Sequence, residues 1–219
     1  MHQRLVSSCS HRTVYCSAQL LLQVVLRALT PIAKGDEVVL SYGPKGNDEL
    51  LTLFGFVDEE NTHDTFLTVG LEELVRSQTA TLFASEAEME RRFALLPPLG
   101  LGEALSNAEL RPSGAPASTW HALRVLLGSA AEASGDLSRL RRPASFETEL
   151  RAWGVVSRYC KSARKAMGGA RKADAAALGR ESRPRARLAI RFRMEKKRLL
   201  AAVEKAIALA EQRSRRAGR

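Results

Sequence analysis

The stretch SYGPKGNDELLTLFGF, residues 41–56, places a tyrosine and two phenylalanines close to a glycine. The Tyr42 hydroxyl can orient a reacting group by hydrogen bonding. The rings of Phe54 and Phe56 can stack on a flat ligand, and Gly55 permits close approach of a backbone. Each residue also has a structural interpretation, with Tyr42 as a buried strand residue and the phenylalanines as core. The residue types alone leave both interpretations open.

Short strands and one short helix are expected to position these residues. Apolar, β-branched runs bounded by turn residues predict strands over residues 20–29, 38–42 and 65–71. Tyr42 then ends the second strand. A short helix is expected over 48–54, with Asn47 as its N-cap and Gly55 as its C-terminal stop.

From about residue 72 the pattern becomes helical. Helices are predicted over residues 71–96, 119–134, 145–167 and 185–212, with a low-complexity link over 168–184. The last helix carries an apolar stripe at Leu188, Phe192, Leu199, Val203, Ile207 and Ala210. Its spacings are four, seven, four, four and three residues. The predicted fold class is therefore α+β, a small β-rich piece followed by an all-helical domain.

The composition excludes several classes of protein. The 3 cysteines include no CxxC pair, so we expect neither a disulfide framework nor a metal site, and an intracellular reducing compartment fits best. The longest apolar run, LLLQVVL at 20–26, is far shorter than the roughly 18 residues that a membrane-spanning helix needs. No membrane association is therefore expected.

Charge is divided unevenly along the chain. Residues 1–150 hold 13 Lys and Arg against 19 Asp and Glu, a net charge of −6. Residues 151–219 hold 21 against 5, a net charge of +16. A basic segment of this kind can bind nucleic acid, an acidic protein or a membrane surface, or can be a solvated helix face. Its few aromatic residues disfavour nucleic acid, because base stacking needs more of them.

Residues 31–64 resemble the C-terminal part of a SET-domain methyltransferase. The matching positions are Ile32, Lys34, Gly35, Asp36, Glu37, Tyr42, Gly43, Asn47, Glu49, Leu50, Gly55, Phe56 and Asn61. The pattern is most similar to the branch of the Rubisco large-subunit lysine methyltransferase, in which a helical substrate-binding domain follows the SET domain. Residues 146–167 and 182–207 resemble two helices of that domain.

The resemblance implies a protein-lysine N-methyltransferase that uses S-adenosyl-L-methionine. Tyr42 matches the tyrosine at the channel where the methyl group meets the amine. Phe54, Gly55 and Phe56 match cofactor contacts. The amine must be neutral, and deprotonating a lysine at pH 7 costs about 4–5 kcal/mol, given its reference pKa near 10.4. Near-attack positioning contributes several kcal/mol. The branch also includes histidine methyltransferases, so lysine and histidine both stay open as targets.

The chain departs from the family pattern before Tyr42. Only 41 residues precede this tyrosine. The family's glycine loop and Asn-His pair have no counterpart there, because Asn47 is the first asparagine and Gly35 is the only glycine before Gly43. We therefore expect a C-terminal fragment, from an incomplete gene model or a truncated reading frame, that binds S-adenosyl-L-methionine weakly or not at all.

The expected organisation has three parts. Residues 1–19 form a divergent N-terminus, residues 20–75 the C-terminal portion of a SET domain, and residues 80–219 a helical substrate-binding domain. The expected partner is a protein substrate bearing a target lysine, bound by a monomer. The cytoplasm, the nucleus and a plastid all stay open as compartments. The alternative function is a catalytically inactive protein-binding module that uses the basic helical domain.

Overall fold

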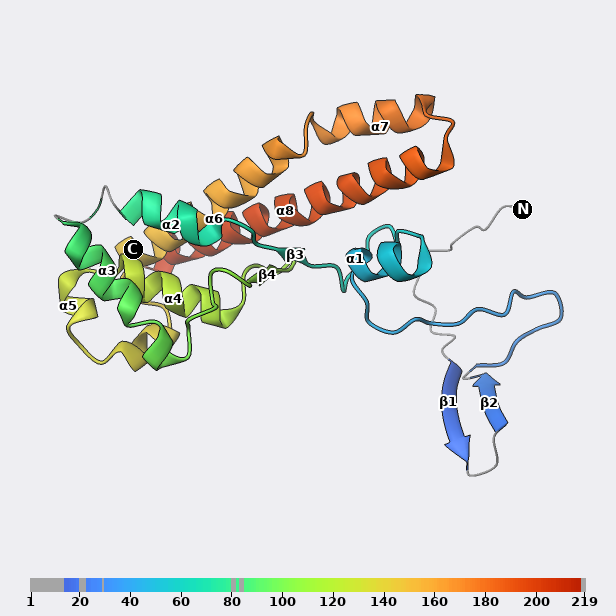
Figure 1. The fold of residues 1–219 in the computed structure, drawn as a ribbon, viewed down its shortest axis with the longest axis horizontal. Coiled ribbons are helices and arrows are strands. Elements are labelled where there is room, and N and C mark those ends of the chain that lie inside the picture. The colour runs from blue at the N-terminus through green and yellow to red at the C-terminus, as the bar shows by residue number, and fades with distance from the viewer. Residues whose placement is uncertain (1–13, 20–22, 29, 80–81, 83–84, 218–219) are drawn as a thin grey trace. The chain divides into compact units, whose positions relative to one another are not determined.

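The computed structural model describes residues 14–19, 23–28, 30–79, 82 and 85–217. Contacts along the chain separate two compact units, Met1–His63 and Asp64–Arg219. The described part of the first unit contains a pair of strands and a short helical segment, whereas the second is mainly helical (Figure 1). A small β part and a helical part thus agree with the α+β expectation.

The sheet of the first unit has two described strands. β1 (Val14–Gln19) pairs antiparallel with β2 (Gln23–Ala28), and Gln19 lies opposite Gln23. β2 confirms the strand expected over 20–29, apart from residues 20–22 and 29, which lie outside the described residues. β1 falls in the N-terminal segment, where no strand was expected.

The strand expected over 38–42 is wrong. Residues 37–42 form no regular backbone pairing. Val38, Val39 and Leu40 are all exposed, so the segment has no buried face. A short β-strand is stable only when it pairs in a sheet and buries one face, which explains why β-branched residues alone do not form one here.

The helical segment of the first unit follows the prediction more closely. α1 (Asn47–Glu49) continues into the π-helical turn η1 (Leu50–Phe54). Gly55 ends the segment with a φ of 76°, and its amide donates to the carbonyls of Leu50 and Leu51. This left-handed conformation is the one that favours glycine after a helix.

The described residues of the second unit form a helical bundle with one minimal sheet. β3 (Phe66–Leu67) pairs antiparallel with β4 (Glu109–Leu110). Its helices are α2 (Leu71–Thr79), α3 (Glu86–Ala94), α4 (Ala117–Leu127), α5 (Ala130–Ala133), α6 (Phe146–Ala166), α7 (Arg171–Arg180) and α8 (Pro184–Ala217). Two 3-10 turns, η2 (Pro97–Leu99) and η3 (Leu137–Arg141), lie between them. The strand expected over 65–71 is thus shortened to β3.

Long periodic segments are confirmed best. α6 confirms the helix expected over 145–167, and α8 contains the whole of the helix expected over 185–212. The helix expected over 119–134 is divided between α4 and α5. α7 forms where only a low-complexity link was expected.

The helix expected over 71–96 is interrupted. α2 ends at Thr79, and α3 begins after Ser85. The Ser85 side chain accepts a hydrogen bond from the Glu88 amide, so it caps the new helix. The sequence Ser-Glu-Ala-Glu is a helix start signal inside an otherwise continuous helical pattern.

The core of the second unit lies where α4, α6 and α8 meet. Most residues of α4 are buried. Leu123 and Leu126 of α4, Val156 of α6 and Leu200 of α8 are completely buried, and all belong to one hydrophobic cluster. Complete burial of such a side chain stabilises the fold by about 1.5–3 kcal/mol. Apolar burial therefore holds these three helices together.

An ion pair lies inside this core. The guanidinium of Arg124 on α4 binds Glu149 on α6 at two points, with Nε 2.6 Å from Oε1 and Nη2 3.0 Å from Oε2. Both side chains are nearly completely buried. The fork of an arginine matches the two oxygens of a carboxylate, so the pair fixes the orientation of α4 against α6.

The C-terminal helices form an extended arm of the bundle. Gly168 and Gly169, both with positive φ, separate α6 from α7. α7 and α8 then pack against each other as a helical hairpin, while α6 packs on the later part of α8 (Figure 1). Pro184 opens α8, where its missing N–H costs no helical hydrogen bond.

Candidate functional site

The four residues expected to contact substrate or cofactor lie together in the first unit. The ring centroid of Tyr42 is 4.1 Å from that of Phe54 and 5.7 Å from that of Phe56. The two phenylalanine centroids are 6.4 Å apart. Gly55 makes the left-handed turn between them. These spacings lie in the contact range of aromatic side chains, so the three rings form one aromatic cluster.

The aromatic cluster is open to solvent. Tyr42 is 48% exposed and Phe54 is 40% exposed. A pocket for a small molecule usually buries most of its ligand's surface between several walls. Within the part of the chain that the structure describes, the cluster therefore offers one contact surface for a flat ligand. Its roles in catalysis and cofactor binding stay predictions.

Two buried asparagines hold the loop next to the cluster. The Asn47 side-chain amide donates to the Asp58 carbonyl at 3.0 Å and accepts from the Asp58 amide at 2.9 Å. The Asn61 side chain donates to the Lys45 carbonyl at 2.8 Å. The expectation that Asn47 caps the helix is thus wrong, because Gly46 is the N-cap and Asn47 binds a distant loop instead.

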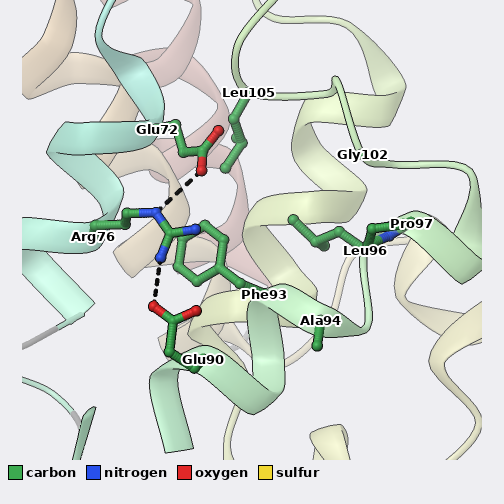
Figure 2. A pocket seen from close by; sticks show the side chains of 9 residues that line it. All are labelled: Glu72, Arg76, Glu90, Phe93, Ala94, Leu96, Pro97, Gly102 and Leu105. Carbon is green, nitrogen blue, oxygen red and sulfur yellow. Dashed lines mark hydrogen bonds and ion pairs between the residues drawn. The ribbon is translucent and has the colours of Figure 1, made fainter. Parts of the chain in front are cut away.

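A hollow in the second unit lies between α2 and α3, and Figure 2 shows its lining. Arg76 of α2 extends between two carboxylates, with Nε 3.1 Å from Glu72 and Nη1 2.8 Å from Glu90. Its guanidinium carbon lies 3.8 Å from the ring centroid of Phe93. Arg76 thus joins α2 to α3 by ion pairs and by a cation–π contact.

The chemistry of this hollow suits binding more than catalysis. Its volume is about 290 Å³, and Leu96, Pro97 and Leu105 form an apolar wall. No serine, cysteine, histidine or lysine is among its lining residues. Both carboxylates already bind Arg76, so the hollow offers neither a nucleophile nor an unpaired base.

Sequence reasoning missed a buried lysine on α8. The Lys196 ammonium lies 2.8 Å from the Asp64 carboxylate and 2.6 Å from the Thr65 carbonyl. The signal was present as the gap of seven residues between Phe192 and Leu199 in the apolar stripe. Position 196 is the missing member of that stripe, so a charged residue there needs a buried partner.

A second buried network joins α8 to α7. The Lys197 ammonium binds the Asp174 carboxylate at 2.7 Å and also the carbonyls of Gly168 and Gly169. Arg193 binds the other oxygen of Asp174 at 2.6 Å. Burial alone would raise the pKa of Asp174, but the hydrogen bonds from Arg193 and Lys197 outweigh it and hold the pKa below its usual range. The network fixes α7 on α8.

Other candidate chemistry is limited. Cys160 is buried in the core, and burial raises the pKa of its thiol to about 12, so it stays protonated and unreactive at neutral pH. No group of three histidine, cysteine or acidic side chains suited to a metal ion occurs among the residues that the structure describes. In the same part of the chain, no helix is long and apolar enough to cross a membrane.

Comparison with known proteins identifies the helical unit. A protein-family model described as Rubisco LSMT substrate-binding matches residues 70–200. The match begins just before α2 and ends inside α8, so it contains the helices α2–α7 and most of the core. No curated protein matches the chain in a sequence search.

Proposed function

Because the chain belongs to the Rubisco LSMT substrate-binding family, we propose that its helical unit binds the protein substrate of a protein-lysine methyltransferase. The family match over residues 70–200 is the observation that carries this proposal. The geometry supports it in two ways. First, the unit has a continuous hydrophobic core, which gives a rigid surface. Second, the hollow between α2 and α3 is lined by apolar and paired charged side chains that can contact a ligand, and its lining includes no catalytic group.

Residues 20–75, which include most of the first unit, are proposed to be the C-terminal portion of a SET domain. The contact between the rings of Tyr42, Phe54 and Phe56 supports this proposal, because side chains that bind the same cofactor must lie close to one another. The rings are tilted against one another, so one of them can stack on a flat adenine while the Tyr42 hydroxyl can hydrogen-bond a reacting amine. S-adenosyl-L-methionine would supply the methyl group. Tyr42 would orient the amine, and Phe54 to Phe56 would cover one side of the cofactor.

A second candidate function is a binding module without methyl transfer. The open aromatic cluster favours it, because Tyr42 and Phe54 have large exposed fractions and an enclosed reaction channel would bury them. In this case the helical unit keeps its docking role, and the first unit only contacts another surface.

Methyl transfer is tested on the protein as it occurs in the cell. An affinity tag placed at the C-terminus of the protein at the chromosomal locus isolates the native protein together with its bound partner. The isolated material is incubated with methyl-labelled S-adenosyl-L-methionine, and labelled residues are located by peptide mapping. We expect label on a lysine of the partner. Tyr42→Phe should lower the transfer rate by about tenfold or more, because it removes a group that orients the reactants.

Tyr159→Phe is the matched control. It removes a tyrosine hydroxyl that donates to the Val69 carbonyl at 2.9 Å within the helical unit, and it should leave the transfer rate unchanged. No label on any partner, or a full rate in the Tyr42→Phe protein, would exclude the enzyme. Retention of the partner without any label would instead support the binding module.

A further inference from the structure

A strongly basic surface covers the α7–α8 hairpin. We define the basic hairpin as residues 171–193, which hold 8 Lys and Arg against 2 Asp and Glu, a net charge of +6. Figure 1 shows it as the extended pair formed by α7 and the first half of α8. The apolar side chains of α7 are small, since alanine supplies most of them. Contacts made by this surface must therefore be mainly electrostatic.

Both acidic residues of the basic hairpin already have internal partners. Asp174 binds Arg193 and Lys197, and Glu181 binds Arg183 at 2.9 Å. Four other cations, by contrast, are exposed and have no ion-pair partner within the described part of the chain: Arg171, Lys172, Arg180 and Arg185. Their positive charge is left for an external partner to neutralise.

The basic hairpin holds these cations on a rigid frame. The Asp174 network fixes the first turn of α7 to α8. Arg187 closes the other end, because its guanidinium donates to the carbonyls of Leu178 and Glu181, both at 2.8 Å. A shallow hollow lined by Arg183, Pro184, Arg185 and Ala186 lies at the turn between the helices. A fixed frame of this kind presents charges at defined distances.

The spacing of these four cations indicates how long a ligand must be to reach both ends of α7. Arg171 and Lys172 begin α7, whereas Arg180 ends it and Arg185 follows in the first turn of α8. The two ends of α7 are about 13 Å apart at a rise of 1.5 Å per residue. An extended chain covers that distance with about four residues at 3.2–3.4 Å each.

We propose that the basic hairpin docks an acidic segment of the protein substrate. Carboxylates about four residues apart would bind Lys172 at one end of α7 and Arg180 at the other, because eight residues are close to a whole number of helical turns and bring these two cations toward one side of α7, with Arg171 and Arg185 next to them along the chain or across the turn. The identity of the ligand as a protein substrate rests on the function proposed above. Nucleic acid fits the surface less well, because the one aromatic of the hairpin, Phe192, is partly buried with Lys196 over its ring.

The test measures the affinity of the full chain for a labelled peptide by fluorescence anisotropy. The probe carries two Glu-Glu pairs separated by a short Gly-Ser spacer and contains no lysine, and a second probe has glutamine in place of every glutamate. The hairpin variant combines Arg171→Glu, Lys172→Glu, Arg180→Glu and Arg185→Glu. It should bind the acidic probe at least about tenfold more weakly than the unchanged chain, since several partly exposed ion pairs of up to about 1 kcal/mol are lost together.

A matched variant separates the site from the overall charge. Arg111→Glu, Arg142→Glu, Lys205→Glu and Arg213→Glu also reverse four exposed cations but lie outside the basic hairpin. This variant should keep the affinity of the unchanged chain within about threefold. Thermal unfolding of both variants shows whether they fold, and glutamine at the same hairpin positions replaces the reversals if those prevent folding.

Two outcomes would overturn the proposal. One is an equal loss of affinity in the hairpin and matched variants, because the attraction would then be non-specific. The other is tighter binding of a duplex DNA probe than of the acidic probe at physiological salt, if the hairpin variant no longer binds the DNA. The surface would then bind nucleic acid.

The peptide contains no lysine, so its binding is measured independently of methyl transfer. Failure of the docking proposal leaves the proposed enzyme intact, and failure of methyl transfer leaves the peptide result intact.

Discussion

The two units of the chain differ in how they accommodate apolar and charged side chains. In the helical unit, leucines and valines of α4, α6 and α8 are buried, and the buried charges are paired, as in Arg124 with Glu149. In the first unit, Tyr42, Phe54 and the apolar residues 38–40 remain exposed. A packed helical frame suits a docking surface, whereas an exposed aromatic cluster suits direct contact with another molecule. Stability and docking are therefore expected to depend on the second unit, and any chemistry on the first.

Breaking the buried ion pair should have the largest effect on stability. Arg124→Met leaves the Glu149 carboxylate buried without its partner, and we expect a loss of about 3–5 kcal/mol in the free energy of unfolding. Chemical denaturation measures this change. Arg111→Met, the same substitution at an exposed position, should change the free energy by no more than about 0.5 kcal/mol. Equal effects of the two substitutions would show that the pair does not hold the core.

A pair of leucine substitutions compares the two units directly. Leu200→Ala empties a completely buried position between the helices and should destabilise the chain by about 2–5 kcal/mol. Leu53→Ala acts at a position that is 63% exposed in the first unit and should cost no more than about 0.5 kcal/mol. Both values come from denaturant unfolding followed by far-ultraviolet circular dichroism. A large cost at Leu53 would contradict the assignment of stability to the helical unit.

Lowering the pH should reduce the stability of the helical unit by a smaller amount, because the Glu132 carboxylate becomes protonated. Burial alone would raise the pKa of Glu132, but hydrogen bonds from the Ser145 and Ser129 amides and from the Thr148 hydroxyl lower it from 4.5 to about 2. The folded protein thus binds this proton less readily than the unfolded chain. The contribution is complete above about pH 4.5 and is lost as the pH falls toward about 2.

The variant Glu132→Gln tests this contribution. We expect it to lower the free energy of unfolding by about 1 kcal/mol at neutral pH, because the carboxylate completes a helix capping box with Ser129 and is partly exposed to solvent. The difference between the variant and the unchanged chain should shrink as the pH falls from about 4.5 to about 3. Unfolding in denaturant at several pH values measures both. A constant difference across this range would show that Glu132 does not titrate with folding.

The fold could be predicted best where the local pattern is strong. α6 and α8 could be predicted because their apolar residues recur at helical spacing. Packing against neighbouring elements stabilises these helices further. α7 was missed because its alanines and arginines form no apolar stripe, and Asp174 holds it in place through contacts with α8. The strand expected over 38–42 was wrong for a related reason, since β-branched residues need a partner strand that the first unit does not provide among its described residues.

The candidate sites also divide into residues that the sequence singled out and residues that only helix packing brings together. The spacing of Tyr42, Phe54 and Phe56 singled out residues that do contact one another, although their catalytic role stays a prediction. The Arg76 hollow between α2 and α3 could not be predicted, because its residues are ordinary members of two amphipathic helices. Glu72 lies one turn before Arg76 on α2, but only the packing of α3 against α2 brings Glu90 to the same guanidinium.

The amino-acid sequence alone established the uneven charge, the helical character of the second unit and the resemblance to the substrate-binding branch. These properties depend on composition or on residues near one another along the chain, where periodicity and spacing are informative. The folded arrangement was needed to show which charges are buried and which remain for a partner. Lys196 meets Asp64 across 132 residues of sequence, and Lys197 meets Asp174 across 23. Such pairs form only when distant elements pack together. The gap in the apolar stripe marks position 196 as buried, but no local pattern identifies Asp64 as the partner of Lys196 or Asp174 as the partner of Lys197.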